Sequence, residues 1–420
     1  MAFLFCAPWG FFDQNLSIIS MATVYPFCAC LPKPGLAAQV ASLPYDVYTR
    51  AEARAAAEGN PLSFLRVTLA DIALPDEVSS YDPKVYDLAA ATWRKFLAQS
   101  VQPDAQPSYY IYSQQMGDHR QYGIVGCASV DEYNAGIVRK HERTRQEKED
   151  DRTRHILATK AQTGPVFLAY RDVTVLNDLV AKVCAEEDPL FDFTASDGIR
   201  HTGWRVPASH NATIRDAFAQ VPILYIADGH HRAAAAARSC AELQGAGESG
   251  RTLAVIFPSS QLRILAYNRV VKDLNGLSNE QFLAELAKVG EVTENAPAVP
   301  AASGEVSIFL AGKWYGLRFR ERHSENPIEA LDVSLLQNQV LQPILGIENP
   351  RTDHRSDFVG GIRGTAELER RVAAGEAVAF SMYPTSLEQL MDVADANGIM
   401  PPKSTWFEPK LRDGLFTHQI

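Results

Sequence analysis

The chain has 420 residues, of which 46% are hydrophobic and 21% are charged, and its formal net charge is −10. This composition is typical of a globular protein with more than one domain. The acidic balance argues against a general nucleic-acid binder, which usually presents a basic face. No stretch reaches the roughly 18 uninterrupted apolar residues of a membrane span. We therefore expect neither nucleic acid nor a membrane as a partner.

The N-terminal stretch is apolar, but no basic residue precedes it, and the first one is Lys33. It therefore does not fit a secretory signal, and we expect residues 1–24 to be an extension, with Met21 as an alternative start. Scattered cysteines without zinc-site spacing indicate reduced thiols and a cytoplasmic protein. These are Cys6, Cys28, Cys30, Cys127, Cys184 and Cys240.

Regular elements follow from residue 50 onward. Alanine-rich residues 50–59 predict a helix that stops at Gly59-Asn60-Pro61, and residues 64–69 alternate like a strand. Residues 86–97 predict a second helix. Residues 109–112 and 122–128 predict a hairpin, and so do residues 191–206, which include Trp204.

Between Arg139 and Arg154, twelve of sixteen residues are charged. A solvated helix with i,i+4 pairs, such as Arg145 with Glu149, is the default interpretation. The exception is His141-Glu142 at its start, because such a pair can supply a general base.

The pattern of residues 221–244 predicts a strand, a turn at Asp228-Gly229 and an alanine-rich helix. His230, His231 and Arg232 then lie at a helix N-terminus, where free N–H groups and the helix dipole favour an anion such as phosphate. An ordinary capped helix start explains the same residues equally well. The P-loop pattern is absent from the sequence.

The division into domains is expected near residues 292–304, which are rich in Ala, Pro, Ser and Gly. We expect an N-terminal α/β region over residues 25–290, with its core at about 130–260, and a C-terminal α/β unit over residues 305–420. Ser278 with Gln281, and Thr385 with Glu388, predict capping boxes.

Two C-terminal stretches are further candidates for a binding site. Gly360, Gly361 and Gly364 permit either a close approach to a ligand or a tight turn. The stretch Lys403-Ser404-Thr405 fits a substrate loop or a packed tail equally well. We take Lys403, Ser404, Thr405 and Trp204 as candidate substrate-binding residues.

From about residue 25 onward, the chain resembles the family known as domain of unknown function 1015. The resemblance rests on seven strings in order, which are 44–47 with 60–61, 122–126, 140–142, 225–232, 268–276, 357–364 and 401–407. That family looks like a relative of the ParB/sulfiredoxin-like nucleotide-binding proteins. The resemblance therefore implies a mixed α/β fold with a ParB/sulfiredoxin-like core and an additional C-terminal α/β unit.

Free-serine kinases of this group share an H-E motif, then E-K, and a D-G-x-H-R turn. The matching residues here are His141-Glu142, Glu147-Lys148 and Asp228 to Arg232. The resemblance implies that Glu142 is the base, with His141 and His231 as further catalytic residues. It also implies that Asp228, Gly229, His230, His231 and Arg232 bind phosphates of ATP or ADP. Mg²⁺ would accompany the nucleotide, with Asp228 as a candidate ligand.

Other functions of the superfold fit less well. The sulfiredoxin nucleophile is a cysteine, and His230 stands in its place. DNA partitioning needs a helix-turn-helix where residues 253–257 predict a strand. We expect a phosphotransferase acting on a hydroxyl metabolite, first of all free L-serine. A non-catalytic nucleotide-binding regulator and a metal-dependent hydrolase that uses the same histidines remain alternatives.

Overall fold

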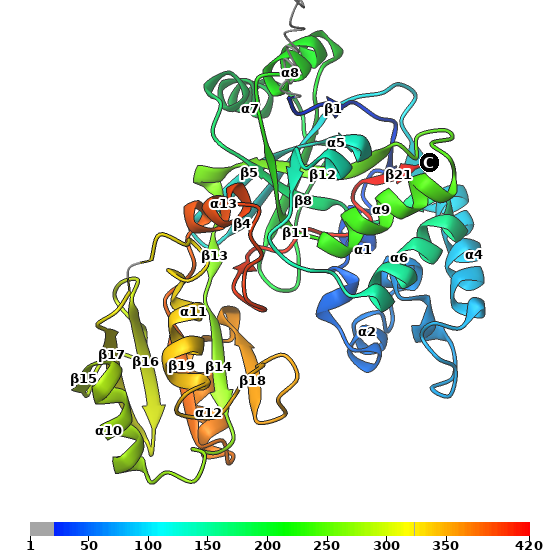
Figure 1. The fold of residues 1–420 in the computed structure, drawn as a ribbon. Helices are drawn as coiled ribbons and strands as arrows, with labels where there is room; N and C mark the ends of the chain where they lie inside the picture. Colours follow the sequence, from blue (N-terminus) through cyan, green and yellow to red (C-terminus); the bar gives the residue numbers. More distant parts are fainter. Residues whose placement is uncertain (1–20, 323) are drawn as a thin grey trace, which may run out of the picture.

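The computed structural model describes residues 21–322 and 324–420, so most of the predicted N-terminal extension lies outside the described residues. The described chain has the expected mixed α/β fold, with a larger N-terminal unit and a smaller C-terminal unit (Figure 1). None of its helices is both long and apolar enough to cross a membrane. The five described cysteines are free thiols, as expected, and Cys6 lies outside the described range.

A mixed sheet forms the centre of the N-terminal unit. Its strands run in the order β6-β11-β8-β12-β5-β4-β10-β9, and β1 pairs with β5. The bounds are β1 (Val24–Tyr25), β4 (Tyr110–Met116), β5 (His119–Ser129), β6 (Val138–Arg139), β8 (Val166–Tyr170), β9 (Phe191–Thr194), β10 (Arg200–Arg205), β11 (Leu224–Asp228) and β12 (Arg251–Pro258). The predicted hairpins are β4–β5 and β9–β10.

Helices surround this sheet, and α4, α6 and α9 lie side by side on one flank (Figure 1). Their bounds are α1 (Ala37–Val40), α2 (Arg50–Ala56), α3 (Leu65–Thr68), α4 (Pro83–Gln99), α5 (Val130–Ala135), α6 (Gln146–Thr159), α7 (Thr174–Glu186), α8 (Asn211–Phe218) and α9 (His230–Glu242). Short 3₁₀ turns are η1 (Tyr45–Val47), η2 (Ala70–Ala73), η3 (Ala208–His210) and η4 (Ser259–Gln261).

The strand predicted over residues 64–69 is wrong, because Leu65–Thr68 form helix α3. The alternation misled because Arg66 is not solvated like an outward-facing strand residue. Its guanidinium turns back to the carbonyl oxygens of Asn60 and Ala57 and so closes the turn after α2. Both neighbours of Arg66 are buried, and a short apolar run does not distinguish strand from helix.

The charged segment also differs from the predicted solvated helix. Helix α6 starts only at Gln146, and Asp151, Arg152 and His155 on it are buried. Glu149 and Asp150 pair with a neighbouring helix, since Arg238 of α9 binds Glu149 at 3.5 Å and Asp150 at 2.7 Å. Helix α6 therefore packs between α4 and α9.

The C-terminal unit contains an antiparallel sheet in the order β15-β17-β16-β19-β14-β18. Its elements are β14 (Tyr267–Val271), α10 (Asn279–Val289), β15 (Gly290–Glu294), β16 (Glu305–Leu310), β17 (Lys313–Phe319), α11 (Asp332–Leu336), the π-helical η5 (Gln337–Leu341), β18 (Ser356–Gly360), η6 (Gly361–Arg363), α12 (Gly364–Ala373), β19 (Val378–Met382) and α13 (Leu387–Asp395). The predicted boundary at residues 292–304 is thus wrong, because β14 and β15 already belong to this sheet.

One of the two predicted capping boxes is confirmed. Ser278 and Gln281 cap α10 as expected. At α13 the box consists of Ser386 and Gln389, one position later than predicted. Thr385 instead donates its hydroxyl to the carbonyl oxygen of Ser404 at 3.1 Å.

The last residues leave the C-terminal unit, which corrects its predicted extent to residue 420. Strand β20 (Trp406–Phe407) pairs with β13 (Ile264–Leu265). Strand β21 (Thr417–Gln419) joins a sheet of the N-terminal unit with β2 (Ala29–Pro32), β3 (Val101–Pro103) and β7 (Ala161–Gln162). Figure 1 shows this tail returning to the larger unit. Residues 400–410 therefore pass between the two units.

Candidate functional site

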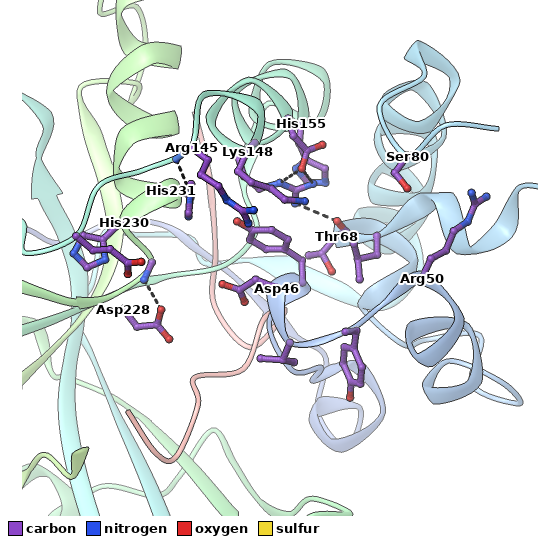
Figure 2. A pocket seen from close by; sticks show the side chains of 18 of the residues that line it. Asp46, Arg50, Thr68, Ser80, Arg145, Lys148, His155, Asp228, His230 and His231 are labelled. Carbon is purple, nitrogen blue, oxygen red and sulfur yellow. Dashed lines mark hydrogen bonds and ion pairs between the residues drawn. The ribbon is translucent and has the colours of Figure 1, made fainter. Parts of the chain in front are cut away.

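A cleft of about 970 Å³ lies beside the end of β11, and both units line it. Figure 2 shows Asp228 and His230 on one side of it and Ser80 and Arg50 on the other. The C-terminal unit and the tail contribute Tyr267, Arg351, Phe358, Pro402, Lys403, Thr405, Trp406 and Lys410 to its wall.

The pairing of β6 with β11 brings two motifs that are distant in the sequence to this cleft. The strands run parallel, with Val138 opposite Leu224 and Arg139 opposite Tyr225. Parallel strands end at the same edge of a sheet, so the segment after β6 emerges beside Asp228 and the start of α9. That segment carries Glu142.

Glu142 lines the cleft with a half-buried carboxylate that is 39% exposed. Burial raises its pKa, while the positive charges of Lys403 and Arg351 oppose the rise. Nη2 of Arg351 lies 3.9 Å from Oε1 of Glu142. A carboxylate whose pKa is raised is a stronger base and suits proton abstraction.

His230 and His231 hold the segment that carries Glu142. Nε2 of His230 accepts the backbone N–H of His141 at 3.4 Å, and Nε2 of His231 accepts that of Arg145 at 3.1 Å. Burial lowers the pKa of both histidines, so the rings are neutral acceptors near pH 7. Both line the cleft, as expected of phosphate-binding residues, although their rings also hold this segment.

His141, expected to be catalytic, lies behind the wall of the cleft and is 3% exposed. Its ring packs edge-on against His230 with the centroids 4.5 Å apart, and its Nε2 lies 3.5 Å from Oγ1 of Thr405. Burial lowers its pKa to about 4. This arrangement supports the position of Glu142 and gives His141 no direct access to a substrate.

Asp228 and Gly229 form the turn at the start of α9. Gly229 has a left-handed backbone with φ of 89° and is the N-cap, a conformation that favours glycine. Oδ1 of Asp228 accepts a hydrogen bond from the Gly229 N–H at 2.7 Å, and Oδ2 accepts one from the Lys410 ammonium at 2.8 Å. Burial alone would raise the pKa of Asp228, but Lys410 and Arg232 hold it well below its usual value.

Arg232 was expected to grip phosphate, but it does not line the cleft. Its Nη1 donates to the carbonyl oxygen of Pro165 at 2.6 Å, and its Nη2 lies 3.7 Å from Oδ1 of Asp46. The guanidinium also lies over the ring of Tyr45, 5.8 Å from its centroid. Arg232 therefore anchors α9 and η1 from beneath.

The cleft carries a surplus of positive charge. Several of its cations are already engaged: Arg50 by backbone carbonyl groups, Arg152 by Asp151 at 2.8 Å, and Lys410 by Asp228. Four others have no acidic ion-pair partner within 4.0 Å among the residues that the structure describes. These are Arg143, Arg145, Lys148 and Lys403. Such a cleft is complementary to an anionic ligand.

The candidate loop Lys403-Ser404-Thr405 is only partly at the site. Lys403 and Thr405 line the cleft, whereas Ser404 is buried and donates to the carbonyl oxygen of Pro401 at 2.7 Å. Gly360 lies against Trp406, because a Cβ atom there would come within 2.7 Å of the indole ring. The close approach at Gly360 is therefore to the side chain of Trp406.

Trp204, a candidate for substrate binding, does not line the cleft. It is buried on β10 in the core of the N-terminal unit and lies 6.4 Å from the ring of Tyr122. Conversely, Arg351 and Lys410 line the cleft and were missed. No local sequence pattern distinguishes either residue, because only the tertiary fold brings it to the cleft.

The residues present do not fit a protein-ligated metal site. Within residues 21–322 and 324–420, no group of three or more His, Cys, Asp or Glu side chains could hold a metal ion. Both carboxylate oxygens of Asp228, the candidate ligand of Mg²⁺, are engaged by Gly229 and Lys410.

The fold and the site define a mixed α/β protein with a cation-rich cleft between two units. The family model described as "Protein of unknown function (DUF1015)" matches residues 24–334, and the chain belongs to this family. No curated protein matches the sequence.

Solved structures with distant similarity include a free serine kinase in complex with AMP. It has 15% sequence identity and a TM-score of 0.35, and the match covers 68% of this chain and 86% of that one. SbnI with a C-terminal truncation from Staphylococcus aureus has 10% identity and a TM-score of 0.39, covering 69% and 85%. A conserved hypothetical protein from Pyrococcus furiosus has 14% identity and a TM-score of 0.34, covering 69% and 93%.

Proposed function

We propose that the protein is a kinase that transfers a phosphoryl group from ATP or ADP to the hydroxyl of a small metabolite, with free L-serine as the first candidate. One observation carries most of the proposal. Glu142, a half-buried carboxylate of raised pKa, lines the same cleft as four cations without an acidic partner in the described chain. Phosphoryl transfer requires mainly this combination of charge neutralisation and positioning.

The proposed step is an in-line displacement. The hydroxyl oxygen of the acceptor forms a bond to the terminal phosphorus of the nucleotide, and the bond from that phosphorus to the bridging oxygen breaks. Glu142 takes the hydroxyl proton. The electron pair of the broken bond stays on the departing nucleotide phosphate, so ATP yields ADP, or ADP yields AMP.

The N-terminal unit offers the features that suit nucleotide phosphates. The N-terminus of α9, at His230 and His231, lines the cleft, and the helix dipole favours an anion there. Arg145 and Lys148 line the same cleft, and Figure 2 shows both on the side of α6 that faces it. Mg²⁺ is expected to arrive as the counter-ion of the phosphates rather than on a protein-built site.

The decisive experiment is a phosphotransfer assay. The purified protein is incubated with Mg²⁺, ATP or ADP, and hydroxyl amino acids or polyols, and products are read by mass spectrometry. Glu142→Gln keeps the size of the side chain and removes the base, so we expect a loss of about 10²- to 10⁴-fold in kcat. The matched control is Glu186→Gln, an exposed change at the end of α7.

Two results would contradict the proposal. Full activity of Glu142→Gln would overturn the role of the base. Nucleotide binding without any phosphorylated product would favour the regulatory alternative.

A further inference from the structure

Five cations of the cleft come from two parts of the chain. One group, with Arg143, Arg145 and Lys148, follows β6 in the N-terminal unit. The other, with Arg351 and Lys403, lies beyond residue 334, where the family match ends. The two groups therefore come from different units of the protein.

The second group is close to the carboxylate. Arg351 lies 3.9 Å from Oε1 of Glu142, which is the one acidic group within 4.0 Å of it among the described residues. Lys403 has no ion-pair partner there, and its ammonium nitrogen lies 5.2 Å from the ring centroid of Tyr267. Two cations thus face a single carboxylate.

A third cation, Arg269, contacts the loop Lys403-Ser404-Thr405. Arg269 of β14 is 3% exposed and has no carboxylate within 4.0 Å in the described chain. It donates to the carbonyl oxygens of Tyr267 and Lys403, the latter at 3.1 Å. A buried guanidinium without a counter-ion is costly, and its charge adds to that of the two cations above it.

The backbone also indicates a constrained loop. Lys403 has φ of 58°, in the left-handed region that L side chains rarely adopt. The loop is held in place by the hydroxyl of Thr385 on the carbonyl oxygen of Ser404 and by Arg269 on that of Lys403. Such strain persists where the surroundings fix it, frequently at ligand sites.

We infer that Arg351 and Lys403 form the acceptor subsite and bind an acidic group of the acceptor, a carboxylate or a phosphate, while Glu142 faces its hydroxyl. This inference rests on the proposed kinase function for the role of Glu142. The substrate class is then a small hydroxy acid or hydroxy phosphate, and the C-terminal unit selects it. A guanidinium and an ammonium suit such a group as a fork and a point charge.

Direct binding tests the subsite without catalysis. Calorimetry compares L-serine with L-serinamide, and glycerate and glycerol 3-phosphate with glycerol, on the full-length protein with and without a non-hydrolysable nucleotide. We expect measurable binding only for compounds with a carboxylate or phosphate. The compound that binds most tightly then shows which of the two acidic groups the subsite prefers. Arg351→Ala and Lys403→Gly should each weaken it about tenfold to a hundredfold.

The choice of Lys403→Gly guards against misfolding, since glycine relieves the left-handed backbone while removing the charge. Lys403→Arg should restore binding, and Lys313→Ala, at an exposed hairpin position of the same unit, is the control. In kinetics the variants should raise the KM of the acceptor and leave that of the nucleotide unchanged.

The outcomes separate this inference from the function on which it rests. Equal binding of acidic and neutral compounds, or an equal rise in the KM of the nucleotide, overturns the acceptor subsite even if the protein is a kinase. Acid-specific binding that depends on Arg351 and Lys403, without phosphotransfer, supports the subsite and overturns the kinase.

Discussion

The ammonium nitrogen of Lys410 lies 2.8 Å from Oδ2 of Asp228, although the two residues are 182 positions apart in the sequence. Asp228 ends the strand that leads to α9, and Lys410 belongs to the tail that returns from the C-terminal unit. Their side chains are 29% and 14% exposed. The pair therefore joins the tail to the turn at the centre of the site.

Replacement of Lys410 by methionine should destabilise the protein by about 2–3 kcal/mol, because Asp228 would keep its charge in a partly buried place without a partner. Chemical denaturation measures the effect. The double variant Lys410→Met with Asp228→Asn should recover part of this loss, since no lone charge remains. A double variant whose loss equals the sum of the two single losses would show that the pair is not coupled.

The pH dependence of this pair has a definite sign. The pKa of Asp228 is lower in the folded protein than its usual value, so its stabilising contribution is complete above the unfolded value of about 3.9 and is lost as the pH falls toward the folded value. We expect the stability difference between wild type and Asp228→Asn to shrink below about pH 4. Urea unfolding from pH 3 to 6 measures it, and a constant difference would contradict the assignment.

The buried side chain of His141 also makes the stability of the protein depend on pH. His141 has a pKa of about 4 in the folded protein because it is buried, so the unfolded chain binds its proton first as the pH falls. Its contribution is complete above about pH 6.5 and is lost between there and pH 4. His141→Gln should therefore flatten the fall of stability over this range, by roughly 1–3 kcal/mol at pH 4.

The same measurement needs a histidine that is not buried. His210→Gln, at a half-buried position of η3, is the control for a general effect of replacing a histidine by glutamine. If wild type loses no stability between pH 6.5 and 4, then His141 is not a buried neutral group.

The sequence allowed prediction of the local elements that carry the site. The strand, turn and helix around Asp228 form as predicted, and so does the position of His141-Glu142 before α6. Local features of the sequence, namely a glycine at the turn, a high alanine content and apolar runs, are enough to indicate these elements. What joins them is the parallel pairing of β6 with β11. A two-residue strand leaves almost no pattern, so this register was not predictable from periodicity.

For some residues the contacts in the structure differ from those expected from the sequence, because tertiary packing determines them. Arg232 has the residue type for phosphate, but Pro165 and Asp46 occupy its guanidinium. Thr385 fits a capping box, but Ser386, one residue later, fits the same pattern and leaves Thr385 free to hold the loop at Ser404. Such competition between neighbouring residues of similar type is settled only by the packed structure.

Asp395 connects α13 to the N-terminal unit through three donors. Arg139, Arg171 at 3.1 Å and the hydroxyl of Tyr225 at 2.8 Å all reach its carboxylate. Because this carboxylate is 35% exposed, Asp395→Ala should change the free energy of unfolding by only about 1 kcal/mol or less. It should nevertheless raise hydrogen exchange in α13 and residues 400–407, while Asp392→Ala on the same helix should not.

The acid limb of the pH–activity profile gives the last prediction. A base must be deprotonated, so kcat/KM should fall as the pH drops below the raised pKa of Glu142. Lys403 lowers that pKa, and removing its charge in Lys403→Met should move the limb to higher pH. Initial rates from pH 4 to 8 measure the shift, with Lys313→Met as the control. A limb that stays in place would mean that Lys403 does not act on the carboxylate of Glu142, and a limb that persists in Glu142→Gln would assign it to another group.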